Sequence, residues 1–285
     1  MIEENELPIP SENDRYVLAA RLKGYLDKHD EAVELLTEAL ERDPDNPILR
    51  RYRAHRRISI RDFHGAIEDS RHALAHLETV EDGYELYQHE VEKDIVNLVL
   101  GRDELVREQF LPKSEARGRE TIYSTTFYSA VYYHFGVALY LNGELQEAAE
   151  NFERAFEVSE HAEALVASLD WLYMIHRRLG DEKEAHAVLA RFAQLSEVDE
   201  SDPGYTERMR LYAGERTPED LIGVSDSREL VNVTQLYGVG NWLHYNGRPA
   251  EAKAVFERVL DSEAKFAFAY MAAEAELSDS ALARI

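Results

Sequence analysis

Residues 132–156 constrain the fold of this chain more than any other stretch, because they form two short helices joined by a tight turn. Large apolar residues at Tyr132, Phe135 and Leu139 follow helical spacing and therefore make a stripe on one side of the first helix. The pair Asn142-Gly143 supplies the left-handed residue at which a helix ends. A second helix follows, and its inner side carries Ala148, Phe152 and Ala155.

Alanines on the inner side of the second helix recur along the chain at a near-constant interval. Ala32 and Ala66 lie 34 residues apart, and Ala185 and Ala252 lie 67 residues apart, close to twice that interval. Regular recurrence of this kind indicates paired helices stacked into an array, in which each pair packs on its neighbours.

The first pair of helices ends at Asp43-Pro44-Asp45-Asn46-Pro47, where proline cannot continue a helix and Asp or Asn caps the next one. Together with the hairpin spacing, this terminator resembles the tetratricopeptide repeat family, whose repeat has about 34 residues. The resemblance implies an all-α fold, a right-handed superhelical solenoid of helical hairpins with a C-terminal capping helix. The stretch YGVGNWLHYNG (237–247) resembles uncharacterised bacterial members of the same family, which implies no particular activity.

The intervals predict the organisation of the whole chain. We expect a flexible N-terminal tail (1–12), two repeats (13–78), a degenerate helical unit with a charged loop (79–128), two repeats (129–196), a degenerate repeat (197–232), one repeat (233–262) and a capping helix (263–285). Within the irregular part, a helix is expected from Tyr84 to Leu100 and an exposed loop from Lys113 to Glu120.

Composition narrows the classes of function. The chain has 56 acidic residues against 32 Lys and Arg, a formal charge of −24, which repels phosphate backbones and anionic lipids, so neither nucleic acid nor a membrane is an expected partner. The chain has no cysteine, which excludes disulfides and thiol catalysis. The N-terminal stretch has neither a basic start nor an apolar core, so we expect a cytoplasmic protein unless a signal has been removed.

In the tetratricopeptide family, the first helices of successive hairpins line a concave surface that holds a segment of another protein. Aromatic and amide side chains suit an extended peptide, since rings give contact area at little entropic cost. The alternative is that these positions are ordinary solvent-facing or inter-helix residues. Carried over repeat by repeat, the expected groove residues are Arg51, His55, Tyr133, Tyr140, Asp170, Arg177, Tyr237, Asn241 and His244.

The lysine and asparagine clamp with which some members of the family hold a C-terminal carboxylate is not reproduced. The corresponding positions of the first two repeats carry Val17, Arg21, Arg51 and His55. We therefore do not expect chaperone-tail binding of that kind.

Six arginines and no acid occur between Arg50 and Arg61 in a chain that is otherwise strongly acidic. One interpretation is a socket for an acidic peptide or a phosphate, because guanidinium groups match both anions. The other, which we favour, is ion pairing inside the array. Its expected partners lie on the preceding helix: Glu31, Glu34, Glu38 and Glu41.

His72 and His76 lie four residues apart, a spacing that can hold a metal ion on one side of a helix. No cysteine or acidic motif in the sequence completes such a site, so we expect solvated histidines, no metal and no cofactor. Nucleophile elbows, phosphate loops and dinucleotide fingerprints are also missing from the sequence. We therefore expect no catalytic residues.

The leading functional hypothesis is a non-catalytic adaptor or scaffold that binds an extended peptide or partner protein. One alternative is a homo-oligomer in which residues 266–277 and the irregular 79–128 segment dock onto another copy. The other alternative is a sensor with a small ligand in the C-terminal half, held among Trp171, Tyr173, His176 and Trp242.

Overall fold

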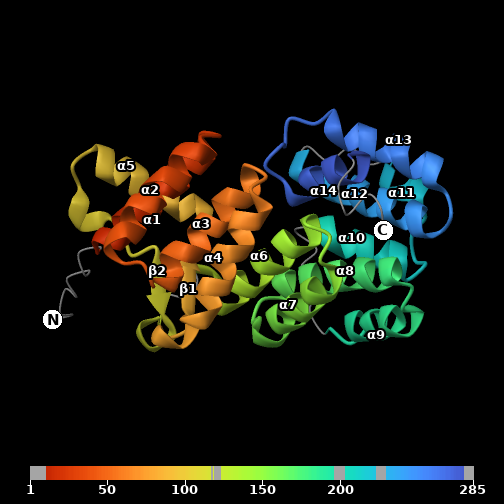
Figure 1. The fold of residues 1–285 in the computed structure, drawn as a ribbon, viewed down its shortest axis with the longest axis horizontal. Helices are drawn as coiled ribbons and strands as arrows, with labels where there is room; N and C mark the ends of the chain where they lie inside the picture. Colours follow the sequence, from red (N-terminus) through yellow and green to blue (C-terminus); the bar gives the residue numbers. More distant parts are fainter. Residues whose placement is uncertain (1–10, 117, 119–122, 196–202, 223–228, 279–285) are drawn as a thin grey trace. The chain divides into compact units, whose positions relative to one another are not determined.

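A computed structural model describes residues 11–116, 118, 123–195, 203–222 and 229–278 of the chain (Figure 1). The chain forms two compact units, residues 1–134 (unit 1) and residues 135–285 (unit 2). Helical hairpins stack within each unit, so the fold class is all-α and solenoid-like, as expected from the sequence. The first ten residues of the expected tail lie outside the described residues.

Unit 1 begins with two helical hairpins, α1 (Glu12–Tyr25) with α2 (His29–Arg42) and α3 (Pro47–Ser59) with α4 (Phe63–Ala75). Ser11 caps α1 in a reciprocal capping box with Asp14, and the side chain of Asn46 caps α3. The hairpins enclose an apolar core made of Val17, Ala20, Ala32, Leu36, Ala39, Leu40, Leu49 and Tyr52.

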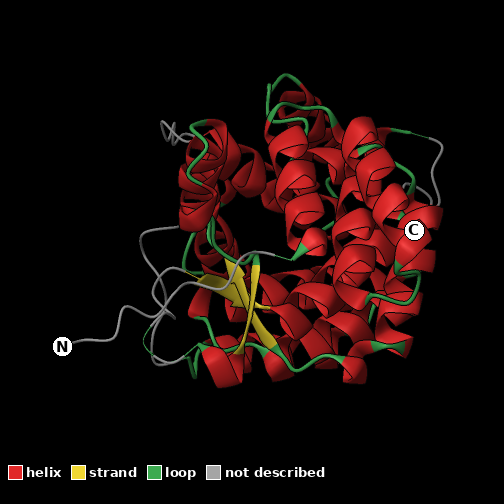
Figure 2. Cartoon of the chain, turned by 90° about the vertical axis from the view of Figure 1, so that its left-hand side faces the viewer, coloured by secondary structure: helices red, strands yellow, loops and turns green. Residues whose placement is uncertain are grey.

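The expected degenerate helical unit between residues 79 and 128 contains a small antiparallel sheet (Figure 2). Its strands are β1 (Gly83–Leu86), β2 (Phe110–Pro112) and β3 (Tyr123–Thr126), in the order β2-β1-β3. A shorter helix follows the first strand, α5 (Gln88–Val99). The expectation of a helix from Tyr84 to Leu100 is therefore wrong at its start, because pairing with two strands distant in sequence outweighs the local helical spacing.

The sheet and α5 are anchored on α1 through an apolar cluster of Leu18, Leu86, Val91, Val106, Leu111 and Ala116. Beyond this cluster, the C-terminal end of α5 and the turn after it are open to solvent, and their exposed apolar side chains are Val96, Leu98, Val99, Leu100 and Leu105. Part of the expected charged loop is ordered as a 3₁₀ turn at Lys113–Glu115, and residues 117, 119 and 120 lie outside the described residues.

Helix α6 (Phe127–Leu141) contains the boundary between the two units. Unit 2 continues with α7 (Leu145–Val158), α8 (Ala162–Leu179), α9 (Glu182–Phe192), α10 (Pro203–Tyr212), α11 (Pro218–Ile222), α12 (Glu229–Tyr245) and α13 (Pro249–Leu260). Consecutive helices pack as pairs, and Gly240 lets α13 approach closely, because a Cβ atom there would lie 2.4 Å from the ring of Phe256.

The last helix, α14 (Phe268–Leu277), packs against α12 and α13, in the position expected of a capping helix. Its apolar side is buried within unit 2, including Tyr270, Met271 and Ala272. The oligomer alternative relies on the exposed side of residues 266–277 and stays a prediction. Phe266, before the helix, stays 54% exposed.

Two of the four residues considered for a small-ligand site, Trp171 and Tyr173, form part of the core of unit 2. Trp171 is 1% exposed and stacks on Phe152, with 5.6 Å between ring centroids and 2° between planes. Tyr173 is 4% exposed and stacks on Tyr212 at 4.5 Å. These two residues therefore pack in the core and do not line a small-ligand site.

Candidate functional site

The expected groove residues of unit 2 lie in its interior. The hydroxyl groups of Tyr140 and Tyr237 are 2.8 Å apart, and the amide of Asn241 donates to Tyr140 Oη over 3.2 Å. All three residues have 0% exposed surface. Arg178 donates to Asn241 Oδ1 over 2.9 Å and forms an ion pair with Glu276 of α14. These residues bind one another and do not lie on an open surface.

Asp170, a further expected groove residue, is also buried. Its Oδ2 atom lies 2.8 Å from Nη2 of Arg208, and both side chains have 0% exposed surface. Burial raises the pKa of the Asp170 carboxyl, and the neighbouring guanidinium opposes that shift. Asp170 and Arg208 thus hold α8 and α10 together inside unit 2.

Two expected groove residues of unit 2 keep partial exposure. Arg177 donates to the hydroxyl of Tyr173 over 3.3 Å, and its guanidinium lies 4.6 Å from the ring centroid of Tyr245. His244 is half-buried, and burial followed by the charge of Arg178 lowers its pKa. Neither residue is grouped with the other expected contacts on a common surface.

The expectation of an open groove in unit 2 is therefore wrong for Tyr140, Asp170, Tyr237 and Asn241. The physical reason is that α8, α10 and α12 pack against one another, and α14 adds Glu276 to the same interior. Alignment of repeats placed these residues on the first helices of their hairpins, but it gave no information on how those helices pack against one another.

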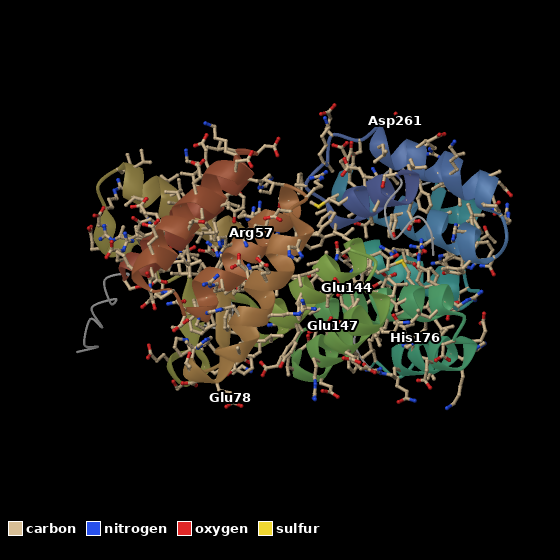
Figure 3. The ribbon with its side chains drawn as sticks, in the orientation of Figure 1. Arg57, Glu78, Glu144, Glu147, His176 and Asp261 are labelled. Carbon is tan, nitrogen blue, oxygen red and sulfur yellow. The ribbon has the colours of Figure 1, made fainter. Side chains whose placement is uncertain are left out.

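In unit 1, three of the six clustered arginines bind one buried carboxylate, that of Asp69 on α4. Nη1 of Arg50 lies 2.8 Å from Oδ1, Nη2 of Arg53 lies 2.6 Å from Oδ1, and Nη1 of Arg57 lies 3.0 Å from Oδ2. Asp69 is 0% exposed, and Figure 3 labels Arg57 among these side chains. Ion pairing inside the array is therefore correct for these arginines, whereas the expected glutamates of α2 are not the partners.

The fourth arginine, Arg51, is an expected groove residue, and it is buried beside the sheet. Its Nη2 atom donates to Oε2 of Glu85 on β1 over 2.6 Å, and Arg51 is 5% exposed. Among the residues that the structure describes, none accepts a hydrogen bond from its Nε atom. Arg51 therefore joins α3 to the inserted sheet, a contact that no repeat alignment predicts.

Further cationic and imidazole groups surround Arg51 on α1, α3 and α6. Nη2 of Arg56 donates to Nδ1 of His55 over 3.1 Å, and the rings of His55 and His134 lie 4.4 Å apart. Arg21 donates to the carbonyl oxygen of Leu86 over 2.8 Å. We call Arg21, Arg51, His55, Arg56 and His134 the Arg-His cluster.

The electrostatics of the Arg-His cluster are unusual for so acidic a chain. Burial, and then the charges of Arg51 and Arg21, lower the pKa of Arg56 to about 10. Burial and the neighbouring cations also hold the pKa values of His55 and His134 well below the ordinary value of 6.5. The imidazoles are therefore neutral at pH 7, while the three guanidinium groups stay charged.

Four of the five members of this cluster keep partial contact with solvent, namely Arg21, His55, Arg56 and His134. Tyr133, the remaining expected groove residue of unit 1, is half-buried and contacts the ring of His134 at 5.7 Å. The structure thus brings together Arg51, His55 and Tyr133 in unit 1. The structure also places Arg21, Arg56 and His134 in this cluster. The sequence had singled out Arg21 as a position of the carboxylate clamp and Arg56 as a member of the arginine run, but it gave no signal for His134.

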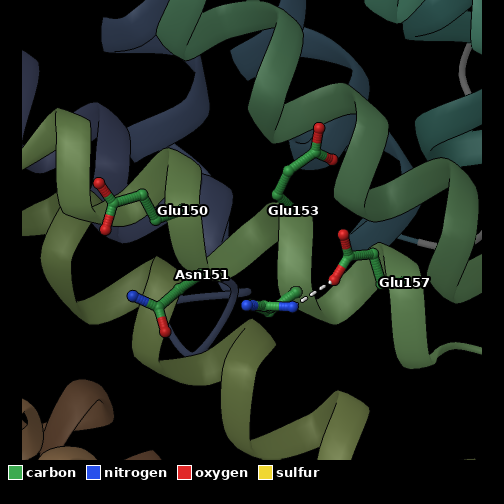
Figure 4. A pocket seen from close by; sticks show the side chains of 5 residues that line it. Glu150, Asn151, Glu153 and Glu157 are labelled. Carbon is green, nitrogen blue, oxygen red and sulfur yellow. Dashed lines mark hydrogen bonds and ion pairs between the residues drawn. The ribbon is translucent and has the colours of Figure 1, made fainter.

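A depression of about 460 Å³ occurs on α7 in unit 2 (Figure 4). Its lining includes Glu150, Glu153 and Glu157, and Nη1 of Arg154 lies 2.8 Å from Oε2 of Glu157. Three carboxylates, one guanidinium and the amide of Asn151, which donates to the carbonyl oxygen of Glu147, provide no nucleophile with a base beside it. This depression therefore supports no chemical role.

The tetratricopeptide repeat family profile matches residues 14–46 and 129–161. These two parts of the chain are tetratricopeptide repeats. The first match covers α1, α2 and the terminator before α3, and the second covers most of α6 and the whole of α7. A search among curated proteins found no match.

Tetratricopeptide repeats generally mediate protein–protein interaction and are typically non-catalytic. Among the helices that the structure describes, none is both long and apolar enough to cross a lipid bilayer. A protein-binding role is thus the starting point for interpreting the Arg-His cluster.

The triple pairing at Asp69 predicts a large effect of removing its charge. Asp69→Asn leaves three guanidinium groups without their carboxylate, which should lower the free energy of unfolding by about 3 to 5 kcal/mol. Glu68→Gln, whose side chain is 65% exposed, is the matched control and should change it by less than about 0.5 kcal/mol. Urea denaturation of both variants measures the difference, and equal effects would contradict the pairing.

The two buried imidazoles predict a pH dependence of stability. Unfolded histidines bind protons near pH 6.5, whereas His55 and His134 do so only at lower pH, so the unfolded state binds more protons below pH 6.5. Their contribution to stability is present above that pH and is lost as pH falls, by about 1.4 kcal/mol per unit of pKa difference.

The double variant His55→Gln/His134→Gln should accordingly lose less stability than the native protein between pH 7.5 and 5.5 in denaturant titrations. His64→Gln, with a side chain that is 81% exposed, should keep the native dependence. A double variant with the native pH dependence would show that these imidazoles titrate normally.

Proposed function

We propose that the protein is a non-catalytic binding module that holds an acidic segment of a partner protein against the Arg-His cluster of unit 1. The observation that carries the proposal is the uncompensated charge of Arg56. Its guanidinium contacts nitrogen atoms of His29 and His55, and among the described residues no carboxylate lies within 4 Å of it. Charged groups surrounded by protein are ordinarily paired, so this cation is suited to an external anion.

The arrangement of neighbouring charges supports the same proposal. The cluster contains three guanidinium groups, and Glu85 is the carboxylate that pairs with Arg51. Arg51 and Arg21 both lower the pKa of Arg56, after burial, because each of these two cations repels the charge of Arg56. A carboxylate from a partner would relieve that repulsion and accept charge-assisted hydrogen bonds from guanidinium N–H groups.

The position of the cluster also favours a partner segment. Arg21 lies on α1 and Arg51 on α3, which are the first helices of their hairpins, the helices that face the ligand in this family. Tyr25, one helical turn after Arg21, is 37% exposed and offers aromatic contact area beside the charges. An extended peptide with acidic side chains matches both features.

The acidic character of the rest of the chain restricts the partner further. A formal charge of −24 repels a long polyanion such as nucleic acid, whereas a short acidic segment can reach a local cationic site. The proposed role is binding alone, and it includes no reaction at the neutral imidazoles of the cluster.

Arg56→Gln tests this function directly. Binding of an unstructured Glu-rich peptide, measured by isothermal titration calorimetry, should weaken by about 10-fold or more, since hydrogen bonds to charged groups contribute roughly 1.5–3 kcal/mol. A Gln-rich peptide of equal length should not bind either protein. The stability of the variant should equal or exceed that of the native protein, because the substitution removes an unpaired charge.

The matched control is Arg154→Gln, on the exposed side of α7, which should bind the Glu-rich peptide with native affinity. Equal affinity of the native protein for both peptides, or native affinity of Arg56→Gln, would overturn the proposed site. Binding of a phosphorylated peptide in place of the Glu-rich one would change the class of partner.

A further inference from the structure

We propose that Asp45, His72 and His76 of unit 1 form a binding site for a divalent transition-metal ion. The sequence contains the two histidines at helical spacing but shows no third ligand beside them. In the structure, the terminator between α2 and α3 supplies that ligand, from a position 27 residues before His72. Asp45 is thus a third potential ligand that the sequence does not show beside the two histidines.

The geometry of the three side chains suits one shared ion. Nε2 of His72 lies 3.0 Å from Oδ1 of Asp45, and Nε2 of His76 lies 3.7 Å from the same oxygen. The ligand atoms of all three residues lie within 4.8 Å of one another. In a tetrahedral site with bonds of 2.0–2.2 Å, neighbouring ligand atoms are about 3.4 Å apart, so only small side-chain movements are needed.

The backbone that carries each ligand is held in place by other contacts. Asn46, next to Asp45, caps α3 and also donates to Asp43, and Arg50 donates to the carbonyl oxygen of Pro44 over 2.9 Å. His72 is on α4, and His76 is its C-cap residue, with imidazole rings stacked at 4.8 Å. The ligands are therefore positioned before any ion arrives, which reduces the entropic cost of binding.

The donor set selects the class of ion. Two imidazole nitrogens and one carboxylate oxygen suit Zn²⁺, Co²⁺, Ni²⁺ or Cu²⁺, whereas Mg²⁺ and Ca²⁺ prefer oxygen ligands throughout. The side chain of Asp45 is 65% exposed and each histidine side chain is 33% exposed, so an ion has access. Three protein ligands also leave coordination positions for water or for a donor atom from another molecule.

A bound ion would join two parts of the first two repeats. Asp45 belongs to the connection between α2 and α3, and the histidines belong to the C-terminal end of α4. Binding to the folded state alone stabilises it by mass action. Metal would therefore raise the melting temperature of the protein independently of any partner, and this separates the inference from the proposed peptide site.

The alternative explanation is a hydrogen bond from Nε2–H of His72 to Oδ1 of Asp45 without any metal. Tag-free, full-length protein should be titrated with Zn²⁺, followed by calorimetry, and with Co²⁺, followed by its visible absorption bands. We expect one equivalent to bind, no binding of Mg²⁺, and a melting temperature raised on the order of 5 °C at a hundredfold excess over the dissociation constant.

Asp45→Asn, His72→Gln and His76→Gln should each weaken Zn²⁺ binding at least about 10- to 100-fold, as loss of a direct ligand should cost no less than loss of a supporting residue. His64→Gln, on the same helix and 81% exposed at its side chain, should bind as the native protein does. Circular dichroism verifies that each variant keeps its helices.

Three results would overturn the site. They are no Zn²⁺ binding by the native protein at millimolar concentration, native affinity in all three ligand variants, or an equal loss in His64→Gln. The hydrogen-bond explanation predicts the first of these results.

Discussion

The neutralisation of buried charge is the constraint on which this structure depends. Inner helices in both units carry arginines, and several of these guanidinium groups meet a carboxylate of the same chain, as Arg53 meets Asp69 and Arg208 meets Asp170. A buried ion without its partner costs several kcal/mol, so such pairs also determine which helices can lie together. Among the arginines of α3, Arg56 is the exception, because its guanidinium contacts imidazole nitrogens and no carboxylate of the described residues.

The two units differ in whether carboxylates of the chain neutralise their buried arginines, and this difference bears on which unit can bind an anionic partner. In unit 2, the two buried guanidinium groups of Arg178 and Arg208 each form an ion pair with a carboxylate, that of Glu276 and that of Asp170. In unit 1, the inner helices retain excess positive charge beside half-buried imidazoles, in a chain whose total charge is strongly negative. The interior of unit 1, with its excess positive charge, is therefore the better candidate for binding a partner, although both units use the same repeat.

Local spacing predicted the helical hairpins and the family correctly, because both follow from residues within one repeat. The strand at Gly83–Leu86 was missed, since it exists only by pairing with Phe110–Pro112 and Tyr123–Thr126. The expectation of a groove at Tyr140 and Tyr237 was wrong for a related reason, because these residues lie 97 positions apart and meet only in the folded unit. The contact between Asp45 and His72 was missed for the same reason, because it forms only when the terminator packs against α4.

Hydrogen–deuterium exchange of the full-length protein, with and without a Glu-rich peptide, tests the central claim most directly. If charge is compensated in unit 2 and not in unit 1, amides of α8 and α12 should exchange slowly in both states, and the peptide should add protection over α1 and α3. Rapid exchange in α12 of the free protein, or peptide-induced protection in α12 in place of α1 and α3, would contradict the account.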